Sequence, residues 1–236
     1  TLRWPHEDPN WKAGRDTAAR PVDFAALLGT RVTIGDRTVT IDNPAGFAPL
    51  TSIRFAGQPI QSLATPDIAI RSIAYVPESM GIFTDLTVQE NMVLAARSAR
   101  RAAELDTQRL EWIFGLFPAL QKFWLYPAGK LSGGQKQMLA VARAIVEPRE
   151  LLLIDEPSKG LAPSIIRNLI DAFGQLKRQD TTILLVEQNF QMARALGDRV
   201  AVMDDGRVVH AGAMAELADD EALQQRLLGL SLGAHQ

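Results

Sequence analysis

Two segments decide the fold: Leu131-Ser132-Gly133-Gly134-Gln135 and, downstream, Leu151-Leu152-Leu153-Ile154-Asp155-Glu156. In the first, a pair of glycines stands where a helix is expected to begin, so the free backbone N–H groups of its first turn can approach a ligand closely. The positive end of the helix dipole favours an anion such as a phosphate, and the Ser132 hydroxyl adds a donor. An ordinary Ser/Gly helix cap is the structural alternative for this pentapeptide taken alone.

The second segment is an apolar run that ends in two acids. A run without polar alternation is typical of a strand buried on both faces of a parallel sheet. Such a strand delivers Asp155 and Glu156 to the carboxyl edge of the sheet, where ligands bind in open α/β folds. Phosphoryl transfer needs Mg²⁺, which suits Asp155, and a group that positions water, which suits Glu156. A charged strand end is the alternative, but the two segments together, in this order and spacing, argue against both alternatives.

Strand and helix patterns alternate around these segments. We expect strands at 73–76, 151–154, 183–186 and 200–203, and helices at 88–104, 107–117, 135–146, 164–176 and 191–196. The alternation from Ile73 to Met203 predicts a parallel sheet with helices on it. We also expect hairpins at 31–41, 52–60 and 200–210, turning at Gly35-Asp36, Gly57-Gln58 and Asp205-Gly206, and short helices within 213–228. Residues 1–30 show no period and are predicted to be irregular.

Composition limits the function classes. The chain has 236 residues, 47% apolar and 22% charged, which predicts a folded α/β domain. A net charge of −2 and a pI near 5.9 argue against broad nucleic-acid binding. The absence of cysteine excludes disulfides and thiolate metal sites. No apolar run approaches the roughly 18 residues that span a bilayer, and Thr1–Asn10 does not resemble a signal peptide, so we expect any membrane role to be peripheral.

The motifs resemble those of ABC transporter ATP-binding subunits. Leu131–Gln135 is similar to the ABC signature, Ile154–Pro157 to the Walker B motif and Ser158–Pro163 to the D-loop. The Gly-Leu-Ala-Pro ending of that D-loop, together with Leu-Val-Glu-Gln-Asn at 185–189, resembles the subunits that energise branched-chain amino acid and urea-type importers. Tyr75-Val76-Pro77-Glu78 resembles the Q-loop, and residues 86–91 resemble the segment after the Q-loop. The resemblance runs from about Ser52 to Leu230.

The resemblance implies a fold and a function. The expected fold is α/β: a P-loop NTPase-like parallel sheet core, a helical signature subdomain at about 86–146 and a small N-terminal antiparallel part, all in one ABC ATPase domain at 31–236. The implied function is ATP hydrolysis, with Mg²⁺, coupled to solute import through transmembrane permease subunits. The implied partner is a second ABC ATPase subunit in a head-to-tail homo- or heterodimer. The implied location is cytoplasmic, on the inner face of the cell membrane.

Each site residue is carried over to its matching position. Catalytic roles fall to Glu156 and Gln188, the Mg²⁺ ligand to Asp155, and the Q-loop place facing the permease to Glu78. The nucleotide of the partner subunit would be bound by Ser132, Gly133, Gly134 and Gln135, and the D-loop positions are Ser158, Gly160, Leu161 and Ala162.

Three positions depart from the family pattern. Glu78 stands where a glutamine is usual, as in some members of the subgroup. Gln188 stands in place of the switch histidine, and a glutamine can bond a γ-phosphate but cannot carry a positive charge. Lys159 is unusual within the D-loop.

One expected motif is missing. Gly-x-x-x-x-Gly-Lys-Ser/Thr, whose backbone and lysine would hold the phosphates, does not occur in the sequence. The nearest string, Gly29–Asp36, is one residue too long and has an acid in place of the lysine. Three explanations are open: a sequence error or frameshift upstream of about Ser52, a real deletion or fusion, or an unrecognised P-loop.

Three hypotheses of function remain open. The leading hypothesis is an energising ATPase for a solute importer. The second is a degenerate, non-catalytic subunit that only completes a partner's ATP site. The third, an ABC ATPase of DNA repair or translation, is disfavoured by the acidic pI and the transport-like D-loop.

Overall fold

The computed structural model describes residues 31–34, 37–42, 52–55, 58–60, 62–97, 99, 101–179, 181–204 and 207–229. The chain divides into two compact units. One unit is Pro66–Leu196, and the other combines Thr1–Thr65 with Gly197–Gln236. Both predicted functional segments lie in the first of these units. The predicted irregular segment 1–30 lies outside the described residues.

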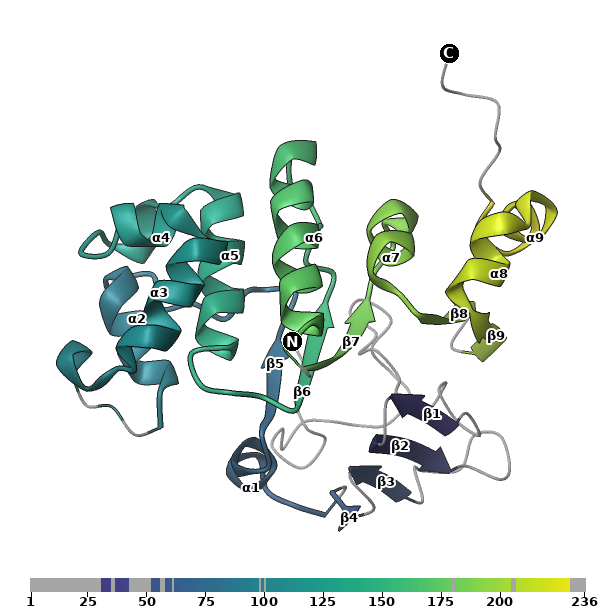
Figure 1. Ribbon diagram of the computed structural model, residues 1–236, viewed down its shortest axis with the longest axis horizontal. Helices are drawn as coiled ribbons and strands as arrows, with labels where there is room; N and C mark the ends of the chain where they lie inside the picture. Colours follow the sequence, from purple (N-terminus) through teal and green to yellow (C-terminus); the bar gives the residue numbers. More distant parts are fainter. Residues whose placement is uncertain are drawn as a thin grey trace, which may run out of the picture. The chain divides into compact units, whose positions relative to one another are not determined.

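A three-stranded parallel sheet runs through the unit Pro66–Leu196. Its strands are β5 (Ile73–Val76), β6 (Leu151–Asp155) and β7 (Thr182–Val186), in the order β5-β6-β7. Figure 1 shows the three arrows side by side and pointing the same way. The predicted parallel sheet is confirmed, with β6 as its central strand. The acids at the end of β6 therefore lie between the ends of two neighbouring strands.

The strand predicted at 200–203 does not continue this sheet. It forms β8 (Arg199–Asp204), which pairs antiparallel with β9 (Arg207–Ala213) as a two-stranded sheet. The hairpin prediction for this region is thus confirmed, and the alternation prediction extended one strand too far. A parallel partner requires a crossover connection, whereas the short link between these strands favours antiparallel pairing.

Three helices pack around the sheet: α5 (Gly133–Ala144), α6 (Pro163–Lys177) and α7 (Phe190–Leu196). Pro163 is the first residue of α6, a position where a missing N–H costs no helical hydrogen bond. Leu152 and Ile154 of β6 are buried in one cluster with residues of α5 and α6, among them Leu139, Leu169 and Phe173. Full burial of each such side chain stabilises the fold by about 1.5–3 kcal/mol, so β6 is fixed tightly beneath the acids it presents.

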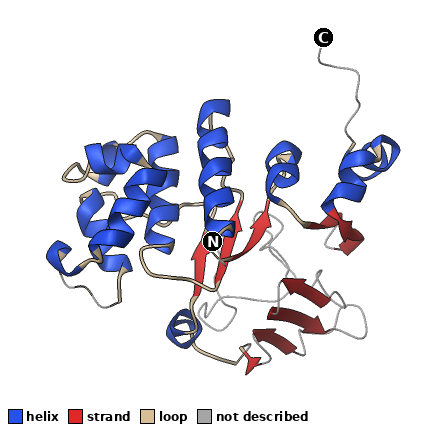
Figure 2. Cartoon of the chain, viewed as in Figure 1, coloured by secondary structure: helices blue, strands red, loops and turns tan. Residues whose placement is uncertain are grey.

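The helices before α5 in the chain are α1 (Thr65–Ile70), α2 (Val88–Ala95), η2 (Ala102–Glu104), α3 (Thr107–Leu116), α4 (Pro118–Lys122) and η3 (Ala128–Lys130). Helices α2, α3 and α4 lie in a group beside α5, as the blue helices of Figure 2 show, whereas α1 precedes β5 and lies apart from that group. The short helices α1 and α4 were not predicted. Pro118 separates α4 from α3, because a proline disfavours a helical conformation in the residue before it.

The single long helix predicted at 88–104 is wrong. Helix α2 ends at Ala95, and Ala96 is extended, with φ −85° and ψ 125°. The physical reason is a contact with a residue that is distant in sequence. The Arg97 backbone N–H donates to Glu147 Oε1 at 2.7 Å instead of to a helical carbonyl. The Arg97 guanidinium also pairs with the same carboxylate at 2.8 Å. A contact fifty residues away in sequence therefore sets where α2 ends.

The other unit contains a four-stranded antiparallel sheet of β1 (Arg31–Ile34), β2 (Arg37–Asp42), β3 (Ser52–Phe55) and β4 (Gln58–Pro59). It confirms both predicted N-terminal hairpins. Gln58 lies in β4 rather than in the turn, and Gly35, Asp36 and Gly57 lie outside the described residues. The predicted short helices are α8 (Met214–Asp219) and α9 (Glu221–Leu228), which ends at Gly229 in a left-handed conformation.

Candidate functional site

The backbone turns sharply where β6 ends. Asp155 is the last residue of the strand and lies opposite Val186 of β7. The Glu156 N–H donates to the Val186 carbonyl at 2.9 Å and extends the ladder by one step. Glu156 itself has φ +42°, a left-handed conformation that is uncommon outside glycine and concentrated at functional sites. The strand therefore delivers two successive carboxylates to the sheet edge and then leaves it.

The Glu156 carboxylate is held from two sides. Gln188 Nε2, two residues beyond β7, donates to Glu156 Oε1 at 2.5 Å. Lys159 Nζ lies 3.4 Å from Glu156 Oε2, and the Glu156 side chain is only 19% exposed. The two residues predicted to be catalytic thus touch one another, in a position where little water reaches the carboxylate.

Asp155 has a different environment. The Tyr75 hydroxyl, from β5, donates to Asp155 Oδ2 at 3.4 Å. Partial burial, followed by the charge of Glu156, raises the pKa of Asp155 above its usual value. Burial, followed by the charge of Asp155, also raises the pKa of Tyr75. Burial is the larger cause of both shifts and a neighbouring carboxylate the second, and a cation bound at Asp155 would offset both by favouring the charged carboxylate.

The donor set at Asp155 fits one kind of metal. Among the described residues, no group of three or more His, Cys, Asp or Glu side chains could enclose an ion. Mg²⁺ usually keeps several waters and is held by one or two carboxylates together with substrate phosphates. A single strand-end carboxylate such as Asp155 is therefore compatible with Mg²⁺ that arrives with a nucleotide.

Glu187 joins the end of β7 to the D-loop, and sequence reasoning missed this role. Its Oε1 accepts the Ser158 N–H at 2.8 Å, and its Oε2 accepts the Asn189 N–H at 2.9 Å. Ser158 is buried, so this backbone donor needs a partner within the protein. The available signal was an acid directly after an apolar strand, next to the candidate Gln188.

The other D-loop positions shape the approach to α6. Gly160 has φ +69°, and the Leu161 N–H donates to the Ser158 carbonyl at 3.1 Å. Ala162 is the N-cap residue of α6. Together these residues form a tight turn between β6 and α6, a conformation that favours glycine at position 160.

The predicted Q-loop residue Glu78 lies beyond β5 and pairs with the D-loop. Lys159 Nζ is 2.6 Å from Glu78 Oε1, and the two side chains are 59% and 48% exposed. The pair lowers the pKa of Glu78 through the hydrogen bond from Lys159. Lys159, for which the sequence offered no role, thus contacts both Glu78 and Glu156.

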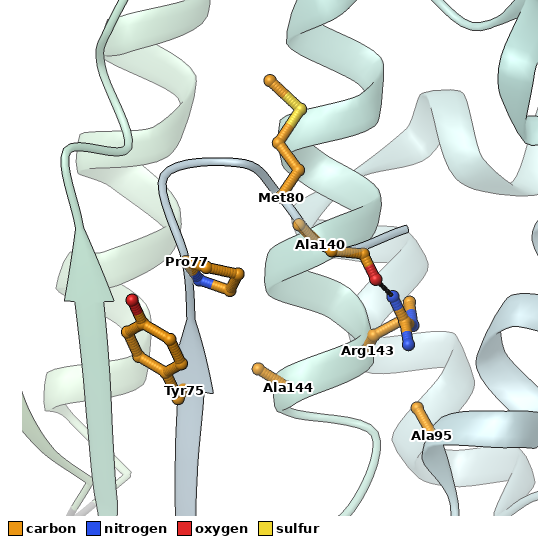
Figure 3. A pocket seen from close by; sticks show the side chains of 8 residues that line it. Tyr75, Pro77, Met80, Ala95, Ala140, Arg143 and Ala144 are labelled. Carbon is orange, nitrogen blue, oxygen red and sulfur yellow. Dashed lines mark hydrogen bonds between the residues drawn. The ribbon is translucent and has the colours of Figure 1, made fainter. Parts of the chain in front are cut away.

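A pocket of about 210 Å³ lies where the turn after Glu78 meets α5. Figure 3 shows Tyr75 and Pro77 on one side and Arg143 and Ala144 of α5 on the other. The Arg143 guanidinium donates to the Gly81 carbonyl and lies 4.9 Å from the centre of the Phe83 ring. Burial lowers the pKa of Arg143. The turn is therefore attached to α5 by a cation.

The four signature residues lie at the start of α5. Ser132 Oγ accepts the Gln135 N–H at 3.4 Å, and Gln135 Oε1 accepts the Ser132 N–H at 2.9 Å, which is a capping box. A Cβ added to Gly134 would lie 2.9 Å from Ile165 Cγ2, whereas one added to Gly133 would meet nothing within 4 Å. Within the described residues, no hydrogen bond joins this group to Asp155, Glu156 or Gln188.

Comparison with known proteins identifies the family. Residues 49–159 match the ABC transporter family. The high-affinity branched-chain amino acid transport ATP-binding protein BraG of Pseudomonas aeruginosa is 38% identical over 179 residues, covering 75% of this chain and 76% of BraG. The branched-chain amino acid transport ATP-binding protein LivF of Archaeoglobus fulgidus is 36% identical over 159 residues, 67% of this chain and 66% of LivF.

The fold agrees with these relatives. A crystal structure of an ATP-binding cassette of an ABC transporter in its ADP conformation superposes with a TM-score of 0.58 at 20% identity, covering 78% of this chain and 80% of that one. Within the described residues, no helix is long and apolar enough to cross a membrane. On the extent of its identity to BraG and the match to the family, this chain belongs to the ATP-binding proteins of ABC transporters.

Proposed function

We propose that this chain is the ATP-binding subunit of a solute importer and couples ATP hydrolysis to transport through transmembrane permease subunits. The names of BraG and LivF support branched-chain amino acids as the solute class. The Gly160–Pro163 ending of the D-loop and the segment 185–189 add urea-type solutes as the alternative class. Work as a peripheral subunit, docked on a permease, is the expected arrangement for the family.

The observation that carries this proposal is the contact between Glu156 and Gln188 beside Asp155. A carboxylate held at a sheet edge is suited to orient an attacking water, and a neighbouring amide is suited to donate a hydrogen bond to a phosphate oxygen. In this proposal Glu156 orients the water, Gln188 donates to the γ-phosphate and Asp155 holds Mg²⁺. When bound, Mg²⁺ supplies positive charge that neutralises the phosphates.

The remaining predicted residues act at the subunit boundary. Ser132, Gly133, Gly134 and Gln135 bind the nucleotide of a second ABC subunit, and the D-loop from Ser158 to Ala162 lines the same junction. The first turn of α5 supports this role, because the helix dipole favours an anion there and the space beside Gly133 is open. Glu78, which is half exposed, faces the permease.

A second candidate function is supported by the sequence itself. No Gly-x-x-x-x-Gly-Lys-Ser/Thr string occurs in it. The residues around Glu156 act on the chain's own nucleotide, whereas those around Ser132 act on a partner's. Without its own phosphate cradle, the chain would bind ATP poorly and hydrolyse it negligibly, and would serve only to complete the ATP site of a catalytic partner.

Turnover of Mg²⁺-ATP by the purified chain tests the first proposal. Hydrolysis should fall about 100-fold or more in Glu156→Gln and should be unchanged in Glu111→Gln, an exposed acid on α3 that serves as the matched control. Equal losses in both variants, or turnover that survives Glu156→Gln, would contradict the assigned role of Glu156.

The same assay separates the second candidate. If the chain alone shows no turnover, we add it to a catalytic ABC subunit and measure the hydrolysis of the mixture. Stimulation that is lost in Ser132→Ala supports the completing role. No turnover alone and no stimulation in the mixture would refute both functions. Uptake of labelled leucine or urea by vesicles that carry the permease then identifies the solute class.

A further inference from the structure

The turn after β5 is fixed at three points along its length. We call Pro77–Phe83 the β5 turn. Glu78 pairs with Lys159, the Gly81 carbonyl accepts from Arg143, and the Phe83 backbone exchanges two hydrogen bonds of 2.9 Å with Asn91. Met80 and Gly81 both have positive φ, 65° and 60°, so the turn has a defined shape.

The three attachments differ in their access to water. Asn91 is 0% exposed, and the Arg143 guanidinium is partly buried, with its Nε shielded from solvent. Glu78 and Lys159 are 48% and 59% exposed. Solvent and salt compete strongly for exposed ion pairs and hardly at all for buried hydrogen bonds. The Glu78 end of the β5 turn is therefore the end that is released most easily.

Lys159 connects the Glu78 end of the β5 turn to the end of β6. Its single ammonium group lies 2.6 Å from Glu78 Oε1, at the end of β5, and 3.4 Å from Glu156 Oε2, at the end of β6. One cation thus serves two carboxylates that would otherwise repel each other. Glu78, Glu156 and Asn91 belong to different elements. The periodicity of a single helix or strand therefore does not explain the contacts that these three residues make.

We propose that Lys159 is a positioning residue that links the β5 turn to Glu156, so that displacement of Glu78 changes how the Glu156 carboxylate is held. With Lys159 in place, Glu156 is fixed from both sides, by Lys159 and by Gln188. When Glu78 moves away, it pulls the Lys159 ammonium away from Glu156. The hydrogen bond from Gln188 is then the remaining contact of the Glu156 carboxylate. The value of this link for hydrolysis rests on the proposed function of Glu156, but the link itself needs no nucleotide.

Hydrogen exchange of the nucleotide-free chain, followed by mass spectrometry, tests the link at both ends. The amides of Glu156, Lys159 and Leu161 are hydrogen-bonded in the turn after β6 and report on it. In Lys159→Met, exchange of peptides over 77–83 and 156–161 should be faster by about two- to fivefold. Lys159→Arg should keep the parent rates, since it keeps the positive charge on a side chain of similar length. Lys122→Met, an exposed lysine on α4, is the matched control and should change neither peptide.

Glu78→Gln distinguishes a link from a local contact. It should change exchange over 156–161, a segment that Glu78 reaches through Lys159, and it should have no further effect when Lys159→Met is already present. The proposal is overturned if Glu78→Gln leaves 156–161 at the parent rate, or if Lys159→Arg behaves like Lys159→Met. Exchange over α5 should stay unchanged in every variant, which verifies folding. Because no ATP is present, these outcomes are independent of the turnover assay.

Discussion

Adjacent glycines at the start of α5 are expected to respond in opposite ways to the same change. A Cβ at Gly134 would lie 2.9 Å from Ile165 Cγ2, closer than real Cβ atoms approach a neighbour, and 3.0 Å from Ile165 Cγ1, which is tighter than most real contacts. A Cβ at Gly133 would meet no atom within 4 Å. Ile165 is partly buried against the core and β-branched, so its χ1 cannot rotate freely out of the way. Gly134→Ala should therefore strain the packing of α5 on α6, whereas Gly133→Ala should not.

The magnitude is set by two opposing effects. Overpacking costs about 1–3 kcal/mol, and replacing glycine by alanine in a helix recovers up to about 1 kcal/mol. Gly134→Ala should thus lower the free energy of unfolding by about 1–2 kcal/mol, or the melting temperature by roughly 2–8 °C for a chain of this size. Gly133→Ala should stay within about 0.5 kcal/mol of the parent.

Urea unfolding and thermal melting measure both variants, and Ile165→Ala provides the decisive background. Once the Ile165 branches are removed, Gly134→Ala should cost nothing or stabilise slightly. The reasoning fails if Gly134→Ala costs the same with and without Ile165, or if Gly133→Ala is equally harmful to stability. Gly133→Ala then becomes a clean probe of nucleotide contact, because any loss of ATP-dependent stimulation in it cannot come from misfolding.

Three further variants test the surroundings of the site. Asn91→Ala leaves the Phe83 backbone without its partner and should cost about 2–3 kcal/mol in urea unfolding, against about 0.5 kcal/mol or less for the exposed Asn168→Ala. Glu187→Gln should cost about 1–2 kcal/mol in thermal unfolding, because an NH2 group replaces one of the two oxygens that accept from Ser158 and Asn189 and would face a backbone N–H; equal stability would contradict this role of Glu187. Asp155→Asn should stabilise the nucleotide-free chain at pH 7, since the folded-state pKa of Asp155 is raised, and the gain should vanish as the pH falls below the ordinary value of 3.8. A gain that persists at that low pH would refute this cause.

Local patterns predicted the elements that position the site, because the apolar pattern of consecutive residues indicates which of them are buried. The apolar run 151–154 predicted β6 to within one residue. Helix α5 begins two residues earlier than predicted, because Ser132 rather than the glycines forms the cap. The end of α2 was missed for a different reason. Residues 88–104 are rich in helix formers, and the contact of Arg97 with Glu147 accompanies the end of the helix at Ala95.

The candidate site shows the same division between local and distant information. Asp155 and Glu156 were predicted from the apolar run that precedes them, and Gln188 was predicted from its match to the place of the switch histidine. The contact between Glu78 and Lys159 joins residues 81 apart in sequence and depends on the pairing of β5 with β6. Glu78 departs from the usual glutamine and Lys159 is unusual in the D-loop, yet neither departure explains itself alone. Seen together, the acid and the base account for each other as an ion pair.

The backbone conformation at Glu156 determines that this residue, and not a neighbour, presents its carboxylate at the sheet edge. Its N–H is the last to bond β7, and its left-handed φ of +42° turns the chain at once into the D-loop, where the Lys159 N–H returns to the Glu156 carbonyl at 3.2 Å. A non-glycine residue pays about 1–3 kcal/mol for such a conformation. A glycine would remove that cost but also the carboxylate that Gln188 and Lys159 hold. The backbone that strains Glu156 is also the backbone that brings Lys159 within reach of Glu78, so the strain and the link between the two strands have one origin.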